Sequence, residues 1–245
     1  MSGTLYLVST PIGNVEDITL RALRILKEVR FIAAEDPHVT KPLLEHHAIE
    51  TPLTTYHGAA KEFATPLILR RLEEGDDVAL VVDAGTPAVA DPGAYLVAAA
   101  LASGITVAAV PGPSAVTAGL PLAGMPCEQF VFFGVFPRGR ALRDRVLAQL
   151  RHESRPAVLF FDAHATSALQ TFGPALGRRR VALVQDVTMP GERVIHGTLR
   201  DVLAQLDGIR NAQLLTLIIE GGMGTKRKKQ RPGWKGPVRS RRAAG

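Results

Sequence analysis

Four short segments of the first half of the chain combine glycine, proline, hydroxyl and acidic residues directly after apolar runs. They read Ser9-Thr10-Pro11-Ile12-Gly13-Asn14, Ala34-Glu35-Asp36, Asp83-Ala84-Gly85-Thr86-Pro87 and Pro111-Gly112-Pro113-Ser114-Ala115. Glycine lets a ligand approach the backbone closely, and proline holds a loop in shape. Any one segment is also compatible with an ordinary turn, in which Asp83 bonds its own backbone or Glu35-Asp36 caps a helix. Four such segments after successive strands predict a ligand site.

The elements that must position these segments alternate between strands and helices as far as about residue 114. Apolar runs predict strands over residues 4–10, 30–36, 77–85 and 106–115, and amphipathic spacing predicts helices over 17–29, 63–75 and 93–104. This alternation is typical of a mostly parallel sheet with helices on both faces. Because parallel strands end at the same edge, we expect the four segments to meet there.

The second half of the chain has its own set of strands and most of the phenylalanines. Strands are predicted over 129–136, 157–163, 180–187, 194–199 and 214–222, with helices near 139–152, 165–176 and 198–206. We therefore expect two α/β domains, residues 1–115 and 116–222, each a mostly parallel or mixed sheet flanked by helices. Two such lobes commonly hold a ligand in the cleft between them.

The net charge of +6 belongs to the end of the chain. Residues 226–245 contain nine basic residues and no acidic one, which leaves 20 basic against 23 acidic residues in the body. This tail, residues 223–245, is expected to be disordered; it is either a solvated end or an arm that binds nucleic acid through Lys226, Arg227, Lys228 and Lys229, with Trp234 available to stack on a base.

Several classes of protein are excluded or disfavoured by the sequence. Dinucleotide-binding and P-loop glycine patterns and the G-x-S-x-G elbow are absent. The single cysteine, Cys127, rules out an internal disulfide and a cysteine-based metal cluster. Adjacent His46 and His47 are expected to be exposed, and no metal site is predicted. Without a membrane-spanning apolar run or a secretory signal, we expect a cytoplasmic protein.

The motifs "STPIGNVEDITLRALRILKEVRFIAAED", "VDAGTPAVADPG" and "VPGPSAVTAGLPLAGMP", in this order and spacing, resemble the tetrapyrrole-methylase superfamily. Within it, they resemble the branch that methylates cytidine 2′-hydroxyls of small-subunit ribosomal RNA, over roughly residues 4–222. The resemblance implies two α/β domains with S-adenosylmethionine (SAM) between them, a homodimer and a ribosomal RNA substrate. Two alternatives are a methylase of a tetrapyrrole intermediate and a relative that binds SAM or RNA without catalysis.

The same resemblance assigns expected roles to particular residues. A ribose hydroxyl needs a proton acceptor, for which the candidates are Glu35, Asp36 and His38. Arg138 and Arg140 in "FPRGRALRDR" are expected to face RNA; the alternative is that they form an exposed basic start of a helix. The cofactor pocket would be lined by Thr10, Pro11, Asp83, Ala84, Gly85, Thr86, Pro111 and Ser114, with Thr10 and Pro11 toward the acceptor.

The chain departs from the family pattern at positions expected to face the acceptor. Where the family has basic residues, this chain has His38, Gln185, Met189 and, after Phe160-Phe161, Thr166. The loops expected to hold SAM keep the family pattern. The sequence therefore indicates the cofactor more firmly than the substrate.

Overall fold

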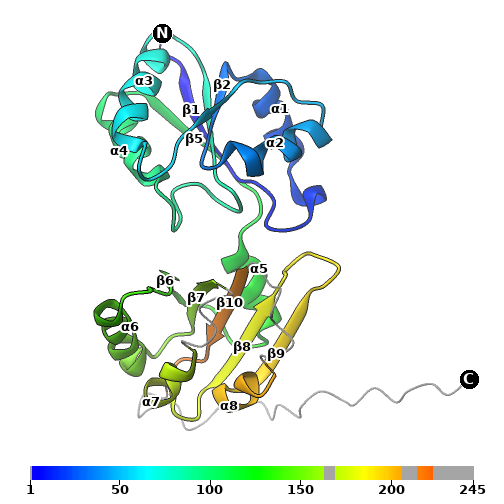
Figure 1. Ribbon diagram of the computed structural model, residues 1–245, viewed down its shortest axis with the longest axis vertical. Coiled ribbons are helices and arrows are strands. Elements are labelled where there is room, and N and C mark those ends of the chain that lie inside the picture. Colours follow the sequence, from blue (N-terminus) through cyan, green and yellow to red (C-terminus); the bar gives the residue numbers. More distant parts are fainter. Residues whose placement is uncertain (1, 163–168, 206–213, 223–245) are drawn as a thin grey trace, which may run out of the picture.

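The structure is a computed structural model that describes residues 2–162, 169–205 and 214–222, and it has two lobes (Figure 1). The elements of the first lobe are β1 (Thr4–Val8), a 3₁₀ turn (Val15–Asp17), α1 (Leu20–Glu28), β2 (Phe31–Ala34), α2 (Pro37–His46), β3 (Leu53–Thr55), α3 (Lys61–Glu73), β4 (Val78–Val81), α4 (Gly93–Ala102) and β5 (Thr106–Val110). The elements of the second lobe are α5 (Ala115–Leu122), β6 (Val131–Val135), α6 (Arg140–His152), β7 (Ala157–Asp162), α7 (Gly173–Leu176), β8 (Arg180–Gln185), β9 (Arg193–Thr198), α8 (Leu199–Leu203) and β10 (Leu214–Ile219). We propose the domain boundary at the loop 111–114, beside the boundary that the sequence predicts between residues 115 and 116.

The first sheet has the order β3-β2-β4-β1-β5, and its paired strands are all parallel. Successive side chains of β2 and β4 alternate between two cores. Ile32 and Val81 pack with α1 and α2 on one face, whereas Ala33 and Leu80 pack with α3 and α4 on the other. Because both faces are covered, the strands are apolar throughout, as the sequence predicts.

The second sheet has the order β6-β7-β10-β8-β9 and is mixed. β6 runs parallel to β7, while β10 is antiparallel to both β7 and β8. One face is covered by α6, α7 and α8 around Phe161, and the other by α5 against Val158 and Ile218. The expected α/β fold, with a parallel or mixed sheet flanked by helices in each half, is confirmed.

Four elements differ from the sequence expectation. Helix α2 and the short edge strand β3 were not predicted, because Pro37 and Pro42 interrupt the apolar spacing of α2 and β3 has three residues. Pro37 nevertheless occupies the first turn, where its missing N–H costs no hydrogen bond. Ala115 begins α5 and does not continue β5. Of the helix expected over 165–176, the structure has α7 at residues 173–176, and residues 163–168 lie outside the described part.

The two lobes are joined by the chain and also touch where the loop after β1 meets the loop between β8 and β9. The backbone N–H of Asn14 donates to Thr188 Oγ1 at 3.2 Å, and a Cβ on Gly13 would lie 2.6 Å from Met189 Cγ. Glycine is therefore required at Gly13 by close packing against the β8–β9 loop. Among the described residues, no helix has the length and apolar character needed to cross a membrane.

Candidate ligand-binding site

The loops that follow β1 and β4 are joined by a two-way backbone bridge. Thr10 N–H donates to the Gly85 carbonyl at 2.9 Å, and Gly85 N–H donates to the Thr10 carbonyl at 3.1 Å. The Thr10 hydroxyl is buried and donates to the Val82 carbonyl at 2.9 Å. Thr10 therefore holds these loops together, and Gly85 turns the chain with a φ of +89° that favours glycine.

The loop after β5 lies against the other two. Ser9 Oγ bonds Thr86 Oγ1 at 3.2 Å, and the Thr86 hydroxyl approaches the Pro113 carbonyl at 3.5 Å. A Cβ on Gly112 would lie 2.9 Å from the Ser9 Cβ, so this position also requires glycine. The expectation that these strand-end loops meet at one edge of the sheet is confirmed.

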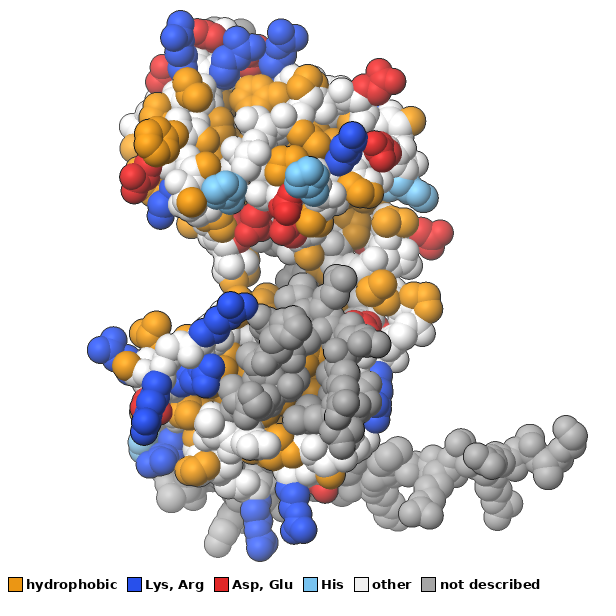
Figure 2. Space-filling model, viewed as in Figure 1, with side chains coloured by type: hydrophobic (Ala, Val, Ile, Leu, Met, Phe, Trp, Pro, Cys, Tyr) orange, Lys and Arg blue, Asp and Glu red, His pale blue; other side chains and the backbone are white. Residues whose placement is uncertain are grey.

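The fourth loop, after β2, brings carboxylates to the same edge. Asp83 Oδ1 accepts the backbone N–H of Asp36 at 3.0 Å, and Glu35 Oε2 receives the Asp83 N–H at 3.5 Å. Asp36 also caps α2, because its Oδ1 accepts the His38 N–H at 2.8 Å. Figure 2 shows a group of acidic side chains on the first lobe where it faces the second across a hollow.

Three carboxyl groups near this edge of the sheet, those of Glu35, Asp83 and Asp91, have raised pKa values. Burial, followed by the nearby Asp83 charge, raises the pKa of Glu35 above its usual range. Burial, with the charge of Asp36 adding to it, raises the pKa of Asp83, and burial raises that of Asp91. The groups thus share one region of unfavourable negative charge, which a cation placed there would relieve.

Asp91 was missing from the residues predicted from sequence, although its Asp-Pro-Gly motif was visible. Its Oδ1 accepts the Gly93 N–H at 2.6 Å, and a Cβ on Gly93 would lie 2.7 Å from that oxygen. The preceding turn places Ala88 and Ala90 at φ values of +68° and +63°, which non-glycine residues rarely adopt. Asp91 therefore ends a strained turn beside the candidate site.

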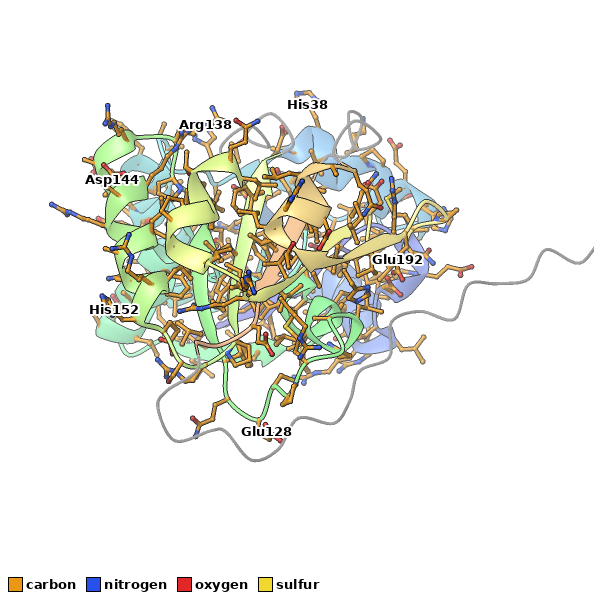
Figure 3. All side chains as sticks on the ribbon, turned by 90° about the horizontal axis from the view of Figure 1, so that it is seen from below. His38, Glu128, Arg138, Asp144, His152 and Glu192 are labelled. Atoms are coloured by element: carbon orange, nitrogen blue, oxygen red, sulfur yellow. The ribbon has the colours of Figure 1, made fainter. Side chains whose placement is uncertain are left out.

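The remaining predicted site residues differ in their surroundings. Pro11, Thr86 and Ser114 are half-buried, whereas Ala84 and Pro111 are exposed on the same loops. The His38 ring is exposed, and Figure 3 places it at the outer edge of the molecule on the same side as Arg138. Arg138 and Arg140 are exposed where the chain enters α6. Thr166 and the basic residues Lys226, Arg227, Lys228 and Lys229 lie outside the described residues.

Two of the departures from the family pattern, Gln185 and Met189, lie at the end of β8 and in the loop that follows it. Both are near the contact between the lobes. Gln185 Nε2 donates to Asp186 Oδ2 at 2.8 Å, and Met189 packs against Gly13. Asp186 and Thr188 have φ values of +48° and +69°, so this loop is strained as well. An uncharged side chain at residue 189 thus packs directly on the loop that follows β1.

A separate cavity of about 380 Å³ lies where β6 begins and α6 ends, away from the loop that joins these two elements. It is lined by Val131, Phe133, Gln149, His152 and Glu153. Val131 is the first residue of β6 and His152 the last of α6, whereas the loop with Arg138 follows the other end of β6. This cavity therefore does not belong to the site formed by the four loops.

The fold and the loops define a class: a two-lobed α/β protein whose candidate ligand site lies at the carboxyl edge of its parallel sheet, facing the second lobe. Comparison with known proteins specifies the family. Residues 4–203 match the family described as Tetrapyrrole (Corrin/Porphyrin) Methylases, and the chain belongs to this family.

Several curated relatives carry the name "Ribosomal RNA small subunit methyltransferase I". The relative from Halalkalibacterium halodurans is 39% identical over 220 residues, covering 89% of this chain and 76% of the relative. That from Xylella fastidiosa is 40% identical over 224 residues, covering 89% and 82%. The relative from Thermotoga maritima is 36% identical over 221 residues, covering 89% and 99%.

Solved structures share the fold at lower identity. A uroporphyrin-III-C-methyltransferase from Thermus thermophilus has a TM-score of 0.65 and 24% identity, covering 88% of this chain and 94% of that one. A diphthine synthase has a TM-score of 0.69 and 16% identity, covering 89% and 90%. A second structure of the Thermus enzyme, with a TM-score of 0.60 and 23% identity, is a complex with S-adenyl homocysteine and covers 88% and 97%.

Proposed function

We propose that this protein is a SAM-dependent methyltransferase that methylates a cytidine 2′-hydroxyl in small-subunit ribosomal RNA. The observation that carries the proposal is the meeting of four loops at one sheet edge, with carboxylates on the side facing the second lobe. The names of the relatives with 36–40% identity support the RNA substrate.

The loops fit the chemistry of SAM, which supplies a methyl group activated on a sulfonium cation. Asp83 provides negative charge for that cation, and burial raises the pKa of this carboxyl group. Gly112 is exposed, so a ligand can approach its backbone, whereas Gly85 is buried and holds its loop in place through the bridge to Thr10. Methyl transfer is an in-line displacement, so the fixed loops also contribute by aligning the acceptor oxygen.

Among the three candidate proton acceptors, we favour Glu35. Asp36 accepts the N–H that begins α2, and the His38 ring lies exposed at the edge of the molecule. Among the residues that the structure describes, the one hydrogen-bond contact to the Glu35 carboxylate is that from the Asp83 N–H at 3.5 Å. Its raised pKa makes the carboxylate a stronger base than an ordinary glutamate, which suits removal of a proton from a ribose hydroxyl.

We assign the RNA backbone to the side of the molecule on which His38 and Arg138 lie (Figure 3). Arg138 and Arg140 are exposed on the second lobe. Guanidinium groups bind phosphates through paired hydrogen bonds, so these side chains would position RNA without reading its sequence.

The function is tested by mass spectrometry of small-subunit ribosomal RNA from a strain that lacks the gene. We expect one ribose methyl group on a cytidine to disappear and to return when the gene is restored. A strain complemented with the Glu35→Gln variant controls for a merely structural role of the protein. An identical methylation map with and without the gene would contradict the proposed function.

A second prediction concerns the basic tail. Removal of residues 224–245 takes away nine basic residues. We expect the truncated protein to bind ribosomal RNA more weakly and with a flatter dependence on salt, because fewer counterions are released from RNA. Filter binding over a series of salt concentrations measures both quantities, with SAM binding as the control; an unchanged slope would rule out the RNA-binding arm.

A further inference from the structure

A fifth loop reaches the edge of the first sheet at which the four loops of the candidate site meet. β3 runs parallel to β2, with Thr55 opposite Ala34, so the chain that follows β3 leaves at the same carboxyl edge. Tyr56 N–H donates to the Ala34 carbonyl at 2.7 Å, directly before Glu35. This β3–α3 loop, residues 56–60, therefore begins beside the residue that we favour as the base.

Tyr56 fixes the start of this loop. Its side chain is 1% exposed in the core between the first sheet and helices α3 and α4, and its hydroxyl shares a hydrogen bond of 3.1 Å with Thr65 of α3. Burial raises the pKa of Tyr56, and the charge of Asp91 adds to it; the same charge acts on Glu35. Tyr56 thus places the next residue, His57, near the carboxylates of the candidate site.

The exposed ring of His57 has one N–H group free for a ligand. Its Nδ1 accepts the Ala59 N–H at 3.2 Å, so the hydrogen of the neutral ring is on Nε2. Within the described part of the chain, His57 Nε2 has no partner. Figure 2 shows histidine side chains on both sides of the acidic group of this lobe. The bond from Ala59 therefore fixes the tautomer that offers a donor next to these carboxylates.

The proposed reaction requires such a donor beside Glu35. The 2′-hydroxyl of an RNA nucleotide and its 3′-phosphate are attached to neighbouring ribose carbons, so a carboxylate that takes the hydroxyl proton also comes close to a negative phosphate. Glu35, Asp83 and Asp91 already share unfavourable negative charge, which the phosphate would increase. A hydrogen-bond donor offsets this repulsion, and Lys61, the first residue of α3 after the loop, adds a positive charge.

We propose that His57 binds the phosphate on the 3′ side of the nucleotide that is methylated, with Nε2–H donating to a phosphate oxygen. The contact holds the ribose in place while its 2′-hydroxyl faces Glu35. This inference rests on the proposed function, because it takes RNA as the substrate. It adds a substrate-binding residue on a loop that supplies neither the base nor a predicted contact to SAM.

Methyl transfer to small-subunit RNA by the variant His57→Ala tests this contact. We expect the KM for RNA to rise about tenfold, a usual effect of losing a hydrogen bond to a charged group, while the affinity for SAM is unchanged. His57→Gln, which can place an N–H near the position of Nε2, should recover most of the loss. Gly58→Ala and His46→Ala are the controls, since a Cβ on Gly58 meets no atom within 4 Å and His46 is exposed at the last residue of α2.

A chemical change in the RNA identifies the phosphate. Once the methylated cytidine has been located, a neutral methylphosphonate replaces the phosphate on its 3′ side. We expect this change to raise the KM of the wild type but not that of His57→Ala, in which the contact is already lost. An unchanged KM in His57→Ala, or an equal effect of the methylphosphonate on both proteins, would overturn the proposal. A wild type that transfers no methyl group to RNA would instead contradict the proposed function, and this inference with it.

Discussion

Replacing Asp83 by alanine is expected to weaken SAM binding by about 10- to 100-fold. The change removes a carboxylate from the edge of the first sheet and leaves the Asp36 N–H without its 3.0 Å acceptor. Attraction between two unit charges about 4 Å apart is worth about 1 kcal/mol in water and about 4 kcal/mol near a protein surface, and this range includes the expected loss of affinity. Isothermal titration of the wild type and the variant with SAM measures the effect directly.

Two further variants separate charge from structure in this experiment. Asp83→Asn keeps an acceptor oxygen for the Asp36 N–H but removes the charge, so we expect an intermediate affinity. Asp76→Ala serves as the control, since Asp76 precedes the other end of β4 and pairs with Arg71 at 2.7 Å. Equal affinities for SAM in the wild type and Asp83→Ala would remove Asp83 from the site.

The pH dependence of SAM binding follows from the same residue. Protonation of Asp83 removes the negative charge available to a sulfonium cation, so affinity is expected to fall as the pH is lowered. Because burial raises the pKa of Asp83, this loss begins at a higher pH than it would for an ordinary aspartate. The dependence should become flatter in Asp83→Asn, which has no carboxyl group to titrate there.

The second large effect is expected for Glu35→Gln, which should slow methyl transfer by about 10²- to 10⁴-fold, the usual contribution of general base catalysis. SAM affinity should change far less than kcat, because glutamine keeps an oxygen for the Asp83 N–H. Single-turnover transfer of labelled methyl groups to small-subunit RNA, measured with saturating SAM, reports the chemical step.

A pH profile distinguishes a base from a positioning group at Glu35. A base must be deprotonated, so the rate is expected to fall as the pH drops through the pKa of Glu35. Burial and the Asp83 charge raise that pKa, which moves the acidic limb above the pH typical of a glutamate. The limb should be absent in Glu35→Gln and retained in Glu45→Gln, an exposed residue of α2 paired with Lys41. An unchanged profile in Glu35→Gln would assign the base elsewhere.

Most of the fold could be predicted because the strands are apolar runs that end at recognisable turns. The run before Asp83 and the glycine at Gly85 predicted both the strand and its exit loop, and the bridge from Gly85 to Thr10 follows from the shared edge of the sheet. A helix cap at Asp36 was one of the interpretations that the sequence allowed, but the extent of α2 escaped prediction because Pro37 and Pro42 interrupt its apolar spacing.

The details of the site depended on contacts between residues far apart in the chain. Nothing in the local sequence indicates that Glu35 would receive the Asp83 N–H, or that burial and the charges of Asp83 and Asp91 would raise the pKa of Glu35. The packing of Met189 on Gly13 joins the two lobes and was equally invisible. Such contacts depend on how the strands are placed relative to one another, and the residue pattern of a single strand does not reveal that placement.

The order of strands has a consequence for how the chain is made. The two cores of the first lobe draw only on residues up to Val110, so this lobe can fold while the second half is still being translated. The second sheet differs, because β10, its last strand in sequence, lies between β7 and β8. A nascent chain that ends before residue 214 therefore keeps the edge with Asp83 and Glu35, but it lacks the strand that unites the opposing lobe.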